Sequence, residues 1–175
     1  MNSATESLAI RRARSSDAEN ISPCLESAFA DFRSFYTPRA FQDTVATPAM
    51  LRDRMRHMAV YVAVTRNAEV VGTIALGIQG EEGHLRGMAV CPACQGSGIA
   101  QRLLGAVESD LLAAGCMRVT LDTTAPLQRA IRFYKRNGFI HSGRVTDFFG
   151  MPLYEYVKQL NCARRRYPSS LLIEG

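Results

Sequence analysis

The chain has 175 residues, of which 47% are hydrophobic and 21% are charged. This length supports one domain with its own core, and the mixture of apolar and charged residues excludes a disordered or fibrous protein. The formal net charge of +5 is spread from Arg11 to Arg166. We therefore expect that these charges are solvated and attract small anionic ligands, and we expect no nucleic-acid partner. The alternative hypothesis is a nucleic-acid-binding protein that uses the basic run 164–166.

The hydrophobic pattern and the cysteines also indicate the cellular compartment of the protein. No apolar run approaches the roughly 18 residues of a spanning helix, and residues 1–7 lack the pattern of a signal peptide. The five cysteines are an odd number within apolar sequence, which favours reduced thiols over a disulfide framework. We expect a cytoplasmic protein without membrane contact.

The elements expected in the first half are a strand (8–14), a helix (18–30), a less regular helical region up to about residue 58, and two strands (59–64 and 70–78). Ser15 to Asp17 supplies N-cap candidates for the first helix, in which Pro23 is tolerable only in the first turn. Pro38 predicts a break after an aromatic segment. Residues 66–69 predict a hairpin turn, so the two strands should pair antiparallel.

The elements expected in the second half are a strand (84–90), a helix (97–114), a strand (117–121), a helix (130–137) and two closing strands (139–145 and 153–157). Gly115 and Gly138 end the two helices, and Pro126 suits the first turn of the second one. A strand that follows a crossover helix lies parallel to the strand before it. The sum is an α/β fold with a mixed sheet: a single domain over residues 1–160, and a polar tail over 161–175 that is a mobile end or a strap on a partner subunit of a possible homodimer.

A glycine-bearing loop, Gln95-Gly-Ser-Gly-Ile-Ala100, joins a strand directly to a helix. The unpaired backbone N–H groups at such a helix start can hold a phosphate. A P-loop would need Lys followed by Ser or Thr where Ile99 and Ala100 stand, so that reading fails. A dinucleotide fingerprint is weak because a third glycine is missing and the unit follows an antiparallel meander.

The third reading is a resemblance to the GCN5-related N-acetyltransferase (GNAT) superfamily. The family's acetyl-CoA loop is Arg/Gln-x-x-Gly-x-Gly/Ala, which Gln95, Gly98 and Ala100 match. The segment 10–18 resembles the family's opening strand and helix start, and 130–139 resembles its last helix motif. The resemblance spans roughly residues 8–158 and implies the order β-α-α-β-β-β-α-β-α-β-β, with two splayed central parallel strands.

The resemblance implies acetyl-CoA as co-substrate and no metal. Backbone groups of the loop, comprising Gln95, Gly96, Ser97, Gly98, Ile99 and Ala100, would hold the pyrophosphate. The pantetheine arm would lie along Met88, Ala89 and Val90, with Phe133 as a further cofactor contact. The backbone N–H near Met88 would face the thioester oxygen.

Tyr134 matches the family's usual general acid, which would protonate the departing thiolate. Where members often carry a glutamate base, this chain has His84, with Glu82 two residues earlier on the same strand face. A second departure is Leu127, at the position of a cofactor-binding asparagine. His84 and Glu82 are thus the candidate bases, acting directly or through water.

Two further features bear on the site. Cys91 and Cys94 form a Cys-x-x-Cys pair, but no further zinc ligands at suitable spacing accompany them, and a redox pair would begin a helix in a different strand order. The acceptor wall should come from the first two helices and the turn 147–151. This region carries several aromatic residues: Phe32, Phe35, Tyr36, Phe148 and Phe149.

These features predict an N-acetyltransferase that moves an acetyl group from acetyl-CoA to a primary amine, of a small molecule or a protein, by direct transfer in a ternary complex. The alternative is a non-catalytic acyl-CoA-binding or regulatory module that kept the loop and lost the chemistry. The sequence names neither the acceptor nor the oligomeric state.

Overall fold

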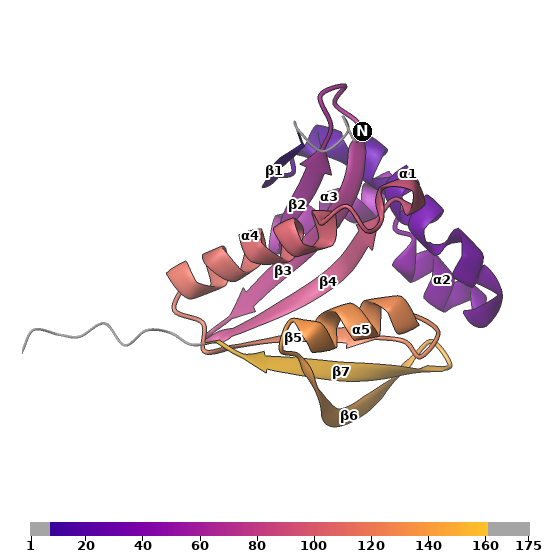
Figure 1. Cartoon of the computed structure of the whole chain (residues 1–175). Coiled ribbons are helices and arrows are strands. Elements are labelled where there is room, and N and C mark those ends of the chain that lie inside the picture. Colours follow the sequence, from indigo (N-terminus) through magenta and orange to yellow (C-terminus); the bar gives the residue numbers. More distant parts are fainter. Residues whose placement is uncertain (1–7, 161–175) are drawn as a thin grey trace, which may run out of the picture.

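A single mixed sheet of seven strands runs through the computed structural model, which describes residues 8–160 (Figure 1). The strands are β1 (Ala9–Arg12), β2 (Ala59–Val64), β3 (Val70–Gln79), β4 (Glu82–Val90), β5 (Arg118–Thr123), β6 (Ile140–Phe148) and β7 (Met151–Gln159). Their order across the sheet is β1-β2-β3-β4-β5-β7-β6. All neighbours are antiparallel except β4 and β5, which are parallel, as expected from the crossover helix between them.

Helices cover both faces of the sheet. They are α1 (Ala18–Phe29), α2 (Pro38–Thr44), α3 (Pro48–His57), α4 (Ile99–Ala113) and α5 (Gln128–Arg136). Leu103, Leu104 and Val107 of α4 are fully buried in one core cluster, which also takes in Tyr134 of α5. Ile21 and Leu25 of α1 belong to a second cluster on the opposite face. Figure 1 shows α4 and α5 in front of the sheet and α1 behind it.

The less regular helical region differs most from its sequence expectation. It consists of a 3-10 segment (Ala30–Phe35) and two helices, α2 and α3. Thr37 and Thr47 accept hydrogen bonds from the backbone N–H groups of Ala40 and Met50, and a proline follows each threonine at the first helical position. Each Thr-Pro pair therefore starts a new helix.

The two prolines expected in first turns lie elsewhere. Pro23 is inside α1, beyond the first turn, and Pro126 precedes α5, whose N-cap residue is Leu127. Asp17 does not cap α1 through its side chain; its carboxylate binds Arg11 and accepts the N–H of Arg14 instead. Tertiary contacts thus override the local capping pattern.

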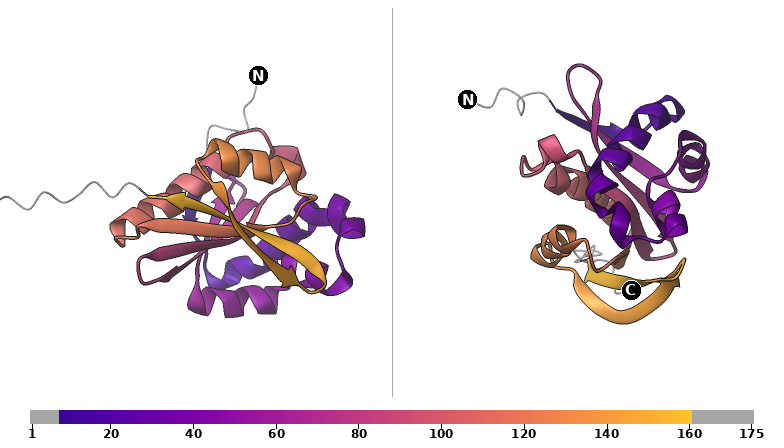
Figure 2. Two further views of the ribbon diagram at one scale, coloured as in Figure 1. Left: turned by 90° about the horizontal axis from the view of Figure 1, so that it is seen from below. Right: turned by 90° about the vertical axis from the view of Figure 1, so that its right-hand side faces the viewer.

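The central parallel strands separate after a short paired stretch. The pairs run from Glu82 with Arg118 to Leu85 with Leu121, and no register partner on β5 follows for the rest of β4. The two views of Figure 2 show the β5–β7 part of the sheet turning away from the β1–β4 part. The splay expected from the family resemblance is therefore present, and it opens the space that holds the candidate site.

No helix among residues 8–160 is long and apolar enough to cross a membrane. The four cysteines in this range, Cys24, Cys91, Cys94 and Cys116, are free thiols. The expected tail, 161–175, with its basic run, lies outside the described residues.

Candidate active site

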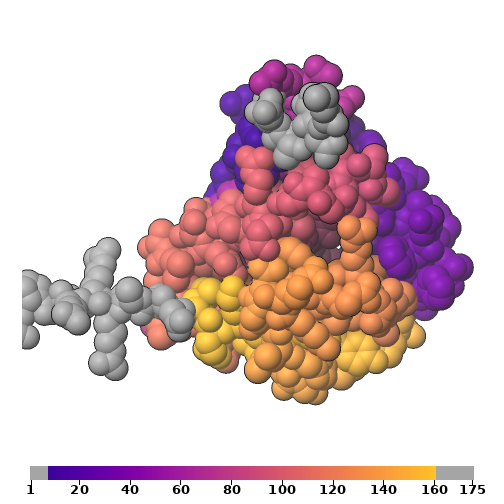
Figure 3. Space-filling model, in the orientation of Figure 1, coloured from indigo at the N-terminus to yellow at the C-terminus, as the bar shows by residue number. Residues whose placement is uncertain are grey.

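A cavity of about 580 Å³ occupies the gap between β4 and β5 and continues under α1, α2 and α5. In Figure 3 the surface is hollowed between the segment before α4 and the start of α5. The cavity has two sides. Met88 and Tyr134 belong to the α4–α5 face, whereas Phe29 and Tyr36 belong to the face under the N-terminal helices.

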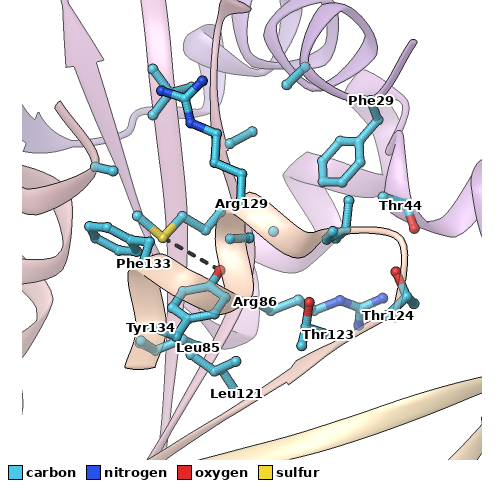
Figure 4. Close-up of a pocket in the computed structure, with 18 of the residues that line it drawn as sticks. Phe29, Thr44, Leu85, Arg86, Leu121, Thr123, Thr124, Arg129, Phe133 and Tyr134 are labelled. Atoms are coloured by element: carbon cyan, nitrogen blue, oxygen red, sulfur yellow. Dashed lines mark hydrogen bonds between the residues drawn. The ribbon is translucent and has the colours of Figure 1, made fainter. Parts of the chain in front are cut away.

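Tyr134 points from α5 into the splay. Its ring is buried between Phe133 and Phe139, with edge-on contacts at centroid distances of 5.7 and 5.9 Å. Its hydroxyl donates to the sulfur of Met88 at 3.7 Å, the dashed line in Figure 4. Burial raises the pKa of this phenol, so it keeps its proton across the neutral range.

A bulge in β4 exposes the backbone next to Met88. On β3, Thr73 pairs with Ala89 and Ala75 pairs with Arg86, so Gly87 and Met88 together face one residue of β3. Gly87 adopts φ +61°, a conformation that favours glycine. Met88 lies beyond the last β4 residue that pairs with β5, and it lines the cavity.

His84 lies on the cavity wall in contact with two β5 side chains. Its Nδ1 is 3.0 Å from Thr120 Oγ1, and its Nε2 is 3.6 Å from Asp122 Oδ2. Thr120 donates its hydroxyl hydrogen to Gly83 O, at 3.4 Å, so we assign the proton of the neutral imidazole to Nδ1. Nε2 is then free to accept a proton, and Asp122 can stabilise the imidazolium that results.

Burial raises the pKa of Asp122, while the nearby His84 acts in the opposite direction. Glu82 occupies a different place. Its carboxylate pairs with the Arg118 guanidinium where β4 begins, and it does not line the cavity that holds Tyr134. The structure thus brings His84 to the splay and leaves Glu82 outside it.

The glycine-bearing loop forms the cofactor-side rim of the cavity. Of its expected binding residues, Gln95, Gly96, Gly98, Ile99 and Ala100 line the cavity and Ser97 does not. Met88, Ala89, Val90 and Phe133 also line it. Gly96 and Gly98 have φ values of +80° and +84°, and a methyl group on Gly98 would meet nothing within 4 Å. The helix that follows has no side-chain cap, which leaves its first N–H groups free to bind an anion.

Arg129 stands beside this loop. Its Nη1 donates to Gln95 Oε1 at 2.8 Å, and Gln95 Nε2 donates to Val90 O at 3.1 Å. A guanidinium is thereby held over the anion-binding end of α4. Leu127, at the position of the family asparagine, lines the cavity as an apolar side chain.

The acceptor side is closed by the β6–β7 turn. Thr37 Oγ1 donates to Phe149 O at 2.8 Å, and the Tyr36 and Thr124 hydroxyls are 2.6 Å apart. Phe32, Tyr36 and Phe148 line the cavity, whereas Phe35 and Phe149 do not. The first helices and Phe148 of the 147–151 turn thus line the cavity, and their role as the acceptor wall stays a prediction.

Comparison with known families decides the class of protein. The model of the acetyltransferase (GNAT) family matches residues 23–139. The chain belongs to the GNAT acetyltransferase family. The match includes the loop and the helix motif with Tyr134, which carried the resemblance in the sequence, and also the splayed strands that the resemblance implied; the opening segment 10–18 lies before it.

Solved structures share the fold of this GNAT protein at low sequence identity. The PaiA N-acetyltransferase of Thermoplasma acidophilum, solved with coenzyme A, has a TM-score of 0.73 at 18% identity and covers 88% of this chain and 99% of its own. The ribosomal-protein-S18-alanine N-acetyltransferase of Escherichia coli has a TM-score of 0.66 at 17% identity, covering 91% and 97%. At such identities the likeness shows the fold and leaves the acceptor open.

Several charged residues of this GNAT site escaped the sequence analysis. They are Asp43, Arg54, Arg86, Asp122 and Arg129. Each lies on a different helix or strand, α2, α3, β4, β5 and α5 in that order, and no motif joins them. One signal was present: Arg54 is three residues after the buried Leu51, on the inward face of α3. Residues 8–160 contain no His, Cys, Asp and Glu cluster suited to a metal ion.

Proposed function

We propose that this GNAT protein transfers an acetyl group from acetyl-CoA directly to a primary amine. The observation that carries the proposal is the contact of the Tyr134 hydroxyl with Met88 inside the splay, in the same cavity that the His84–Asp122 pair lines. Acid and base thus stand at one gap, which is what aminolysis of a thioester requires.

The residues present suit a CoA thioester. The uncapped start of α4 and the Arg129 guanidinium match a pyrophosphate in charge and hydrogen bonding. Thr123 Oγ1 is buried, lines the cavity and has no hydrogen-bond partner among residues 8–160, so it can receive a polar group of the pantetheine arm. Bound there, acetyl-CoA would supply the activated acyl group.

The chain's own groups account for each proton. His84 Nε2 takes the proton that the amine loses as its nitrogen bonds to the acetyl carbon, directly or through water. The Met88 N–H stabilises the negative charge that develops on the carbonyl oxygen. Tyr134 donates its proton to the sulfur as the C–S bond breaks, and solvent then carries a proton from His84 back to Tyr134.

A covalent acetyl-enzyme is disfavoured. Among residues 8–160, Cys94 is the thiol that lines the cavity. Burial and the neighbouring Cys91 raise its pKa, so it stays protonated and is a weak nucleophile. Transfer in a ternary complex is the chemistry that remains.

The Tyr134→Phe variant tests this function. Loss of the acid should lower kcat by about 100-fold or more with little change in affinity for acetyl-CoA. Free-thiol release with a panel of amines measures the rate, and calorimetry measures cofactor binding. Tyr156→Phe is the matched control, because Tyr156 is equally buried but does not line the cavity.

Two results would contradict the proposal. Unchanged kcat in Tyr134→Phe across pH 6 to 9 removes the phenol from the mechanism. Tight acetyl-CoA binding without thiol release against the whole panel favours a non-catalytic acyl-CoA-binding module.

A further inference from the structure

The side chain of one arginine in the cavity has no hydrogen-bond or ion-pair partner among residues 8–160. Arg54 extends from α3 into the cavity and lies against the β4 bulge. A methyl group on Gly87 would be only 2.8 Å from Arg54 Nη1, so the missing side chain lets the guanidinium approach the strand backbone. Gly87 is the neighbour of Met88, where the thioester is expected to lie.

The one carboxylate close to Arg54 is already engaged. Asp43 of α2 forms an ion pair with the Arg86 guanidinium, and both residues line the cavity. In Figure 4 the Arg86 and Arg129 side chains point in different directions, and Arg86 extends toward Thr123 and Thr124. Asp122, on the same side, faces His84.

The backbone carbonyl of Arg54 accepts from the Met58 N–H, but its guanidinium makes no hydrogen bond or ion pair with the side chains or backbone of residues 8–160. Burial and then repulsion by Arg86 lower its pKa to about 10, against a smaller opposing effect of Asp43. The guanidinium therefore remains charged at neutral pH with its N–H donors unpaired. Because partly buried N–H donors without a partner are unfavourable, an anionic ligand that accepts their hydrogen bonds would be stabilised at this site.

We propose that the acceptor is a small amine that also carries a carboxylate, and that Arg54 binds this carboxylate. The inference rests on the proposed acetyltransferase function and names the acceptor class for the same site. Arg54 would act as a specificity-determining residue, holding the acceptor's anionic end while the amine faces the splay.

The local charges favour a carboxylate over a phosphate. Arg86 is already paired with Asp43 and also interacts with Asp122, so the single positive charge of Arg54 is left without a paired carboxylate among residues 8–160. One carboxylate neutralises that charge, whereas a phosphate dianion would leave an excess negative charge in a partly buried site. The cavity of about 580 Å³ holds the end of the cofactor arm as well, which favours a small acceptor over a protein.

The test compares each acceptor with its uncharged partner. Free α-, β- and γ-amino acids are assayed for thiol release beside their carboxamides, together with an aminoalkyl phosphate. We expect at least one free amino acid to exceed its carboxamide in kcat/KM by about tenfold or more. Preference for the aminoalkyl phosphate would contradict the charge argument and overturn the proposal.

Arg54→Gln should remove this preference. Its kcat/KM for the free acid should fall by about tenfold or more, through KM, while that for the carboxamide stays unchanged. Arg54→Lys should recover part of the loss. Arg56→Gln is the matched control, because Arg56 is on the same helix, is exposed and lies outside the cavity. Thermal unfolding of each variant checks that α3 remains folded.

A binding measurement separates the two proposals. With CoA bound, N-acetylglycine and N-acetylglycinamide are titrated into the wild type and Arg54→Gln. If the wild type binds the acid but not the amide, and Arg54→Gln loses this binding, Arg54 binds the carboxylate as proposed. This conclusion holds even if no amine releases thiol, since the absence of thiol release would overturn only the proposed enzyme function. If the wild type and Arg54→Gln turn over or bind the acid and the amide equally, the proposed role of Arg54 in carboxylate binding is overturned, but the proposed acetyltransferase function is not.

Discussion

Burial raises the pKa of both Tyr134 and Asp122, and so favours the neutral form of each. For the phenol this secures a proton donor throughout the working pH range. For the carboxyl the proximity of His84 counteracts burial, because an imidazolium at Nε2 stabilises the ionised aspartate. The protonation of each residue is therefore set by its neighbours in the cavity.

The Asp122→Asn variant should work more slowly than the wild type, by about tenfold or more, because the imidazolium loses its stabilising charge. In the wild type, kcat/KM should fall as pH drops and the carboxyl, with its raised pKa, takes up a proton. That step should vanish in the variant. The measurement is a profile of kcat/KM over about pH 5 to 9, with Asp31→Asn, at an exposed residue outside the cavity, as the control. A variant with the wild-type profile and rate would exclude Asp122 from proton transfer.

Arg129→Gln should raise the KM for acetyl-CoA about tenfold with kcat nearly unchanged, since the guanidinium lies at the loop that we propose binds the pyrophosphate and not at the proposed reacting atoms. The wild-type affinity should also weaken with salt, and the variant's less so. Calorimetry at two salt concentrations tests both statements. Arg132→Gln, on the same helix but outside the cavity, is the control. Equal salt dependence in wild type and variant would contradict the assignment.

Close contact between strand and helix fixes the geometry of the splay. Gly83 on β4 lies directly beneath Leu111 of α4, and a methyl group on Gly83 would come 2.2 Å from Leu111 Cδ2. Gly83 pairs with Val119 in the short parallel stretch, two pairs before the strands part. The helix therefore packs tightest where the two strands are still joined.

Gly83→Ala should destabilise the fold by about 1–3 kcal/mol, because Leu111 is fully buried and must leave its position. Urea unfolding gives the free energy. The double variant with Leu111→Ala should lose less than the sum of the two single changes, since the smaller side chain makes room for the methyl group. Gly105→Ala, on α4 with nothing within 4 Å of an added methyl group, is the control. Additive losses would show that the two residues do not interact.

Across the whole molecule, the first strand ties the N-terminal helices to the sheet. Arg11 on β1 donates to both Asp17 oxygens, at 2.7 and 2.9 Å, and the Arg14 N–H donates to Oδ2 at 2.6 Å. The Arg11 hydrogen bonds are the main cause of the lowered pKa of Asp17, against burial. This carboxylate joins β1 to the start of the helical layer that walls the acceptor side.

Since the pKa of Asp17 is lowered in the folded state, its contribution to stability is full above the unfolded pKa, about 4, and is lost as pH falls through the folded value. Asp17→Asn should therefore cost about 1–2 kcal/mol near pH 7 and progressively less toward pH 2, with part of the Arg11 interaction screened by solvent. Urea unfolding across this range measures the difference. Glu19→Gln, at an exposed ion pair, is the control. A deficit that stays constant with pH would refute the electrostatic origin.

The sequence by itself determined the element order, the antiparallel meander, the parallel crossover and the loop, because these follow from local patterns and short motifs. It also identified Tyr134 and His84 as candidates. It did not separate α2 from α3, where two Thr-Pro caps divide a region of weak periodicity. The C-terminal strands are also longer than their apolar pattern indicated, since pairing extends them to a tight turn at Phe149 and Gly150.

Only the tertiary structure decided which charged residues share the cavity. Glu82 and His84 look equivalent in the strand pattern, but the splay begins after Leu85, so His84 faces the gap and Glu82 meets Arg118. Arg54 and Asp122 come from elements about seventy residues apart in the chain. Both residues lie close to β4 because of the strand order in the sheet and the bulge at Gly87. These are long-range features of the packing, which the spacing of residues along the sequence does not reveal.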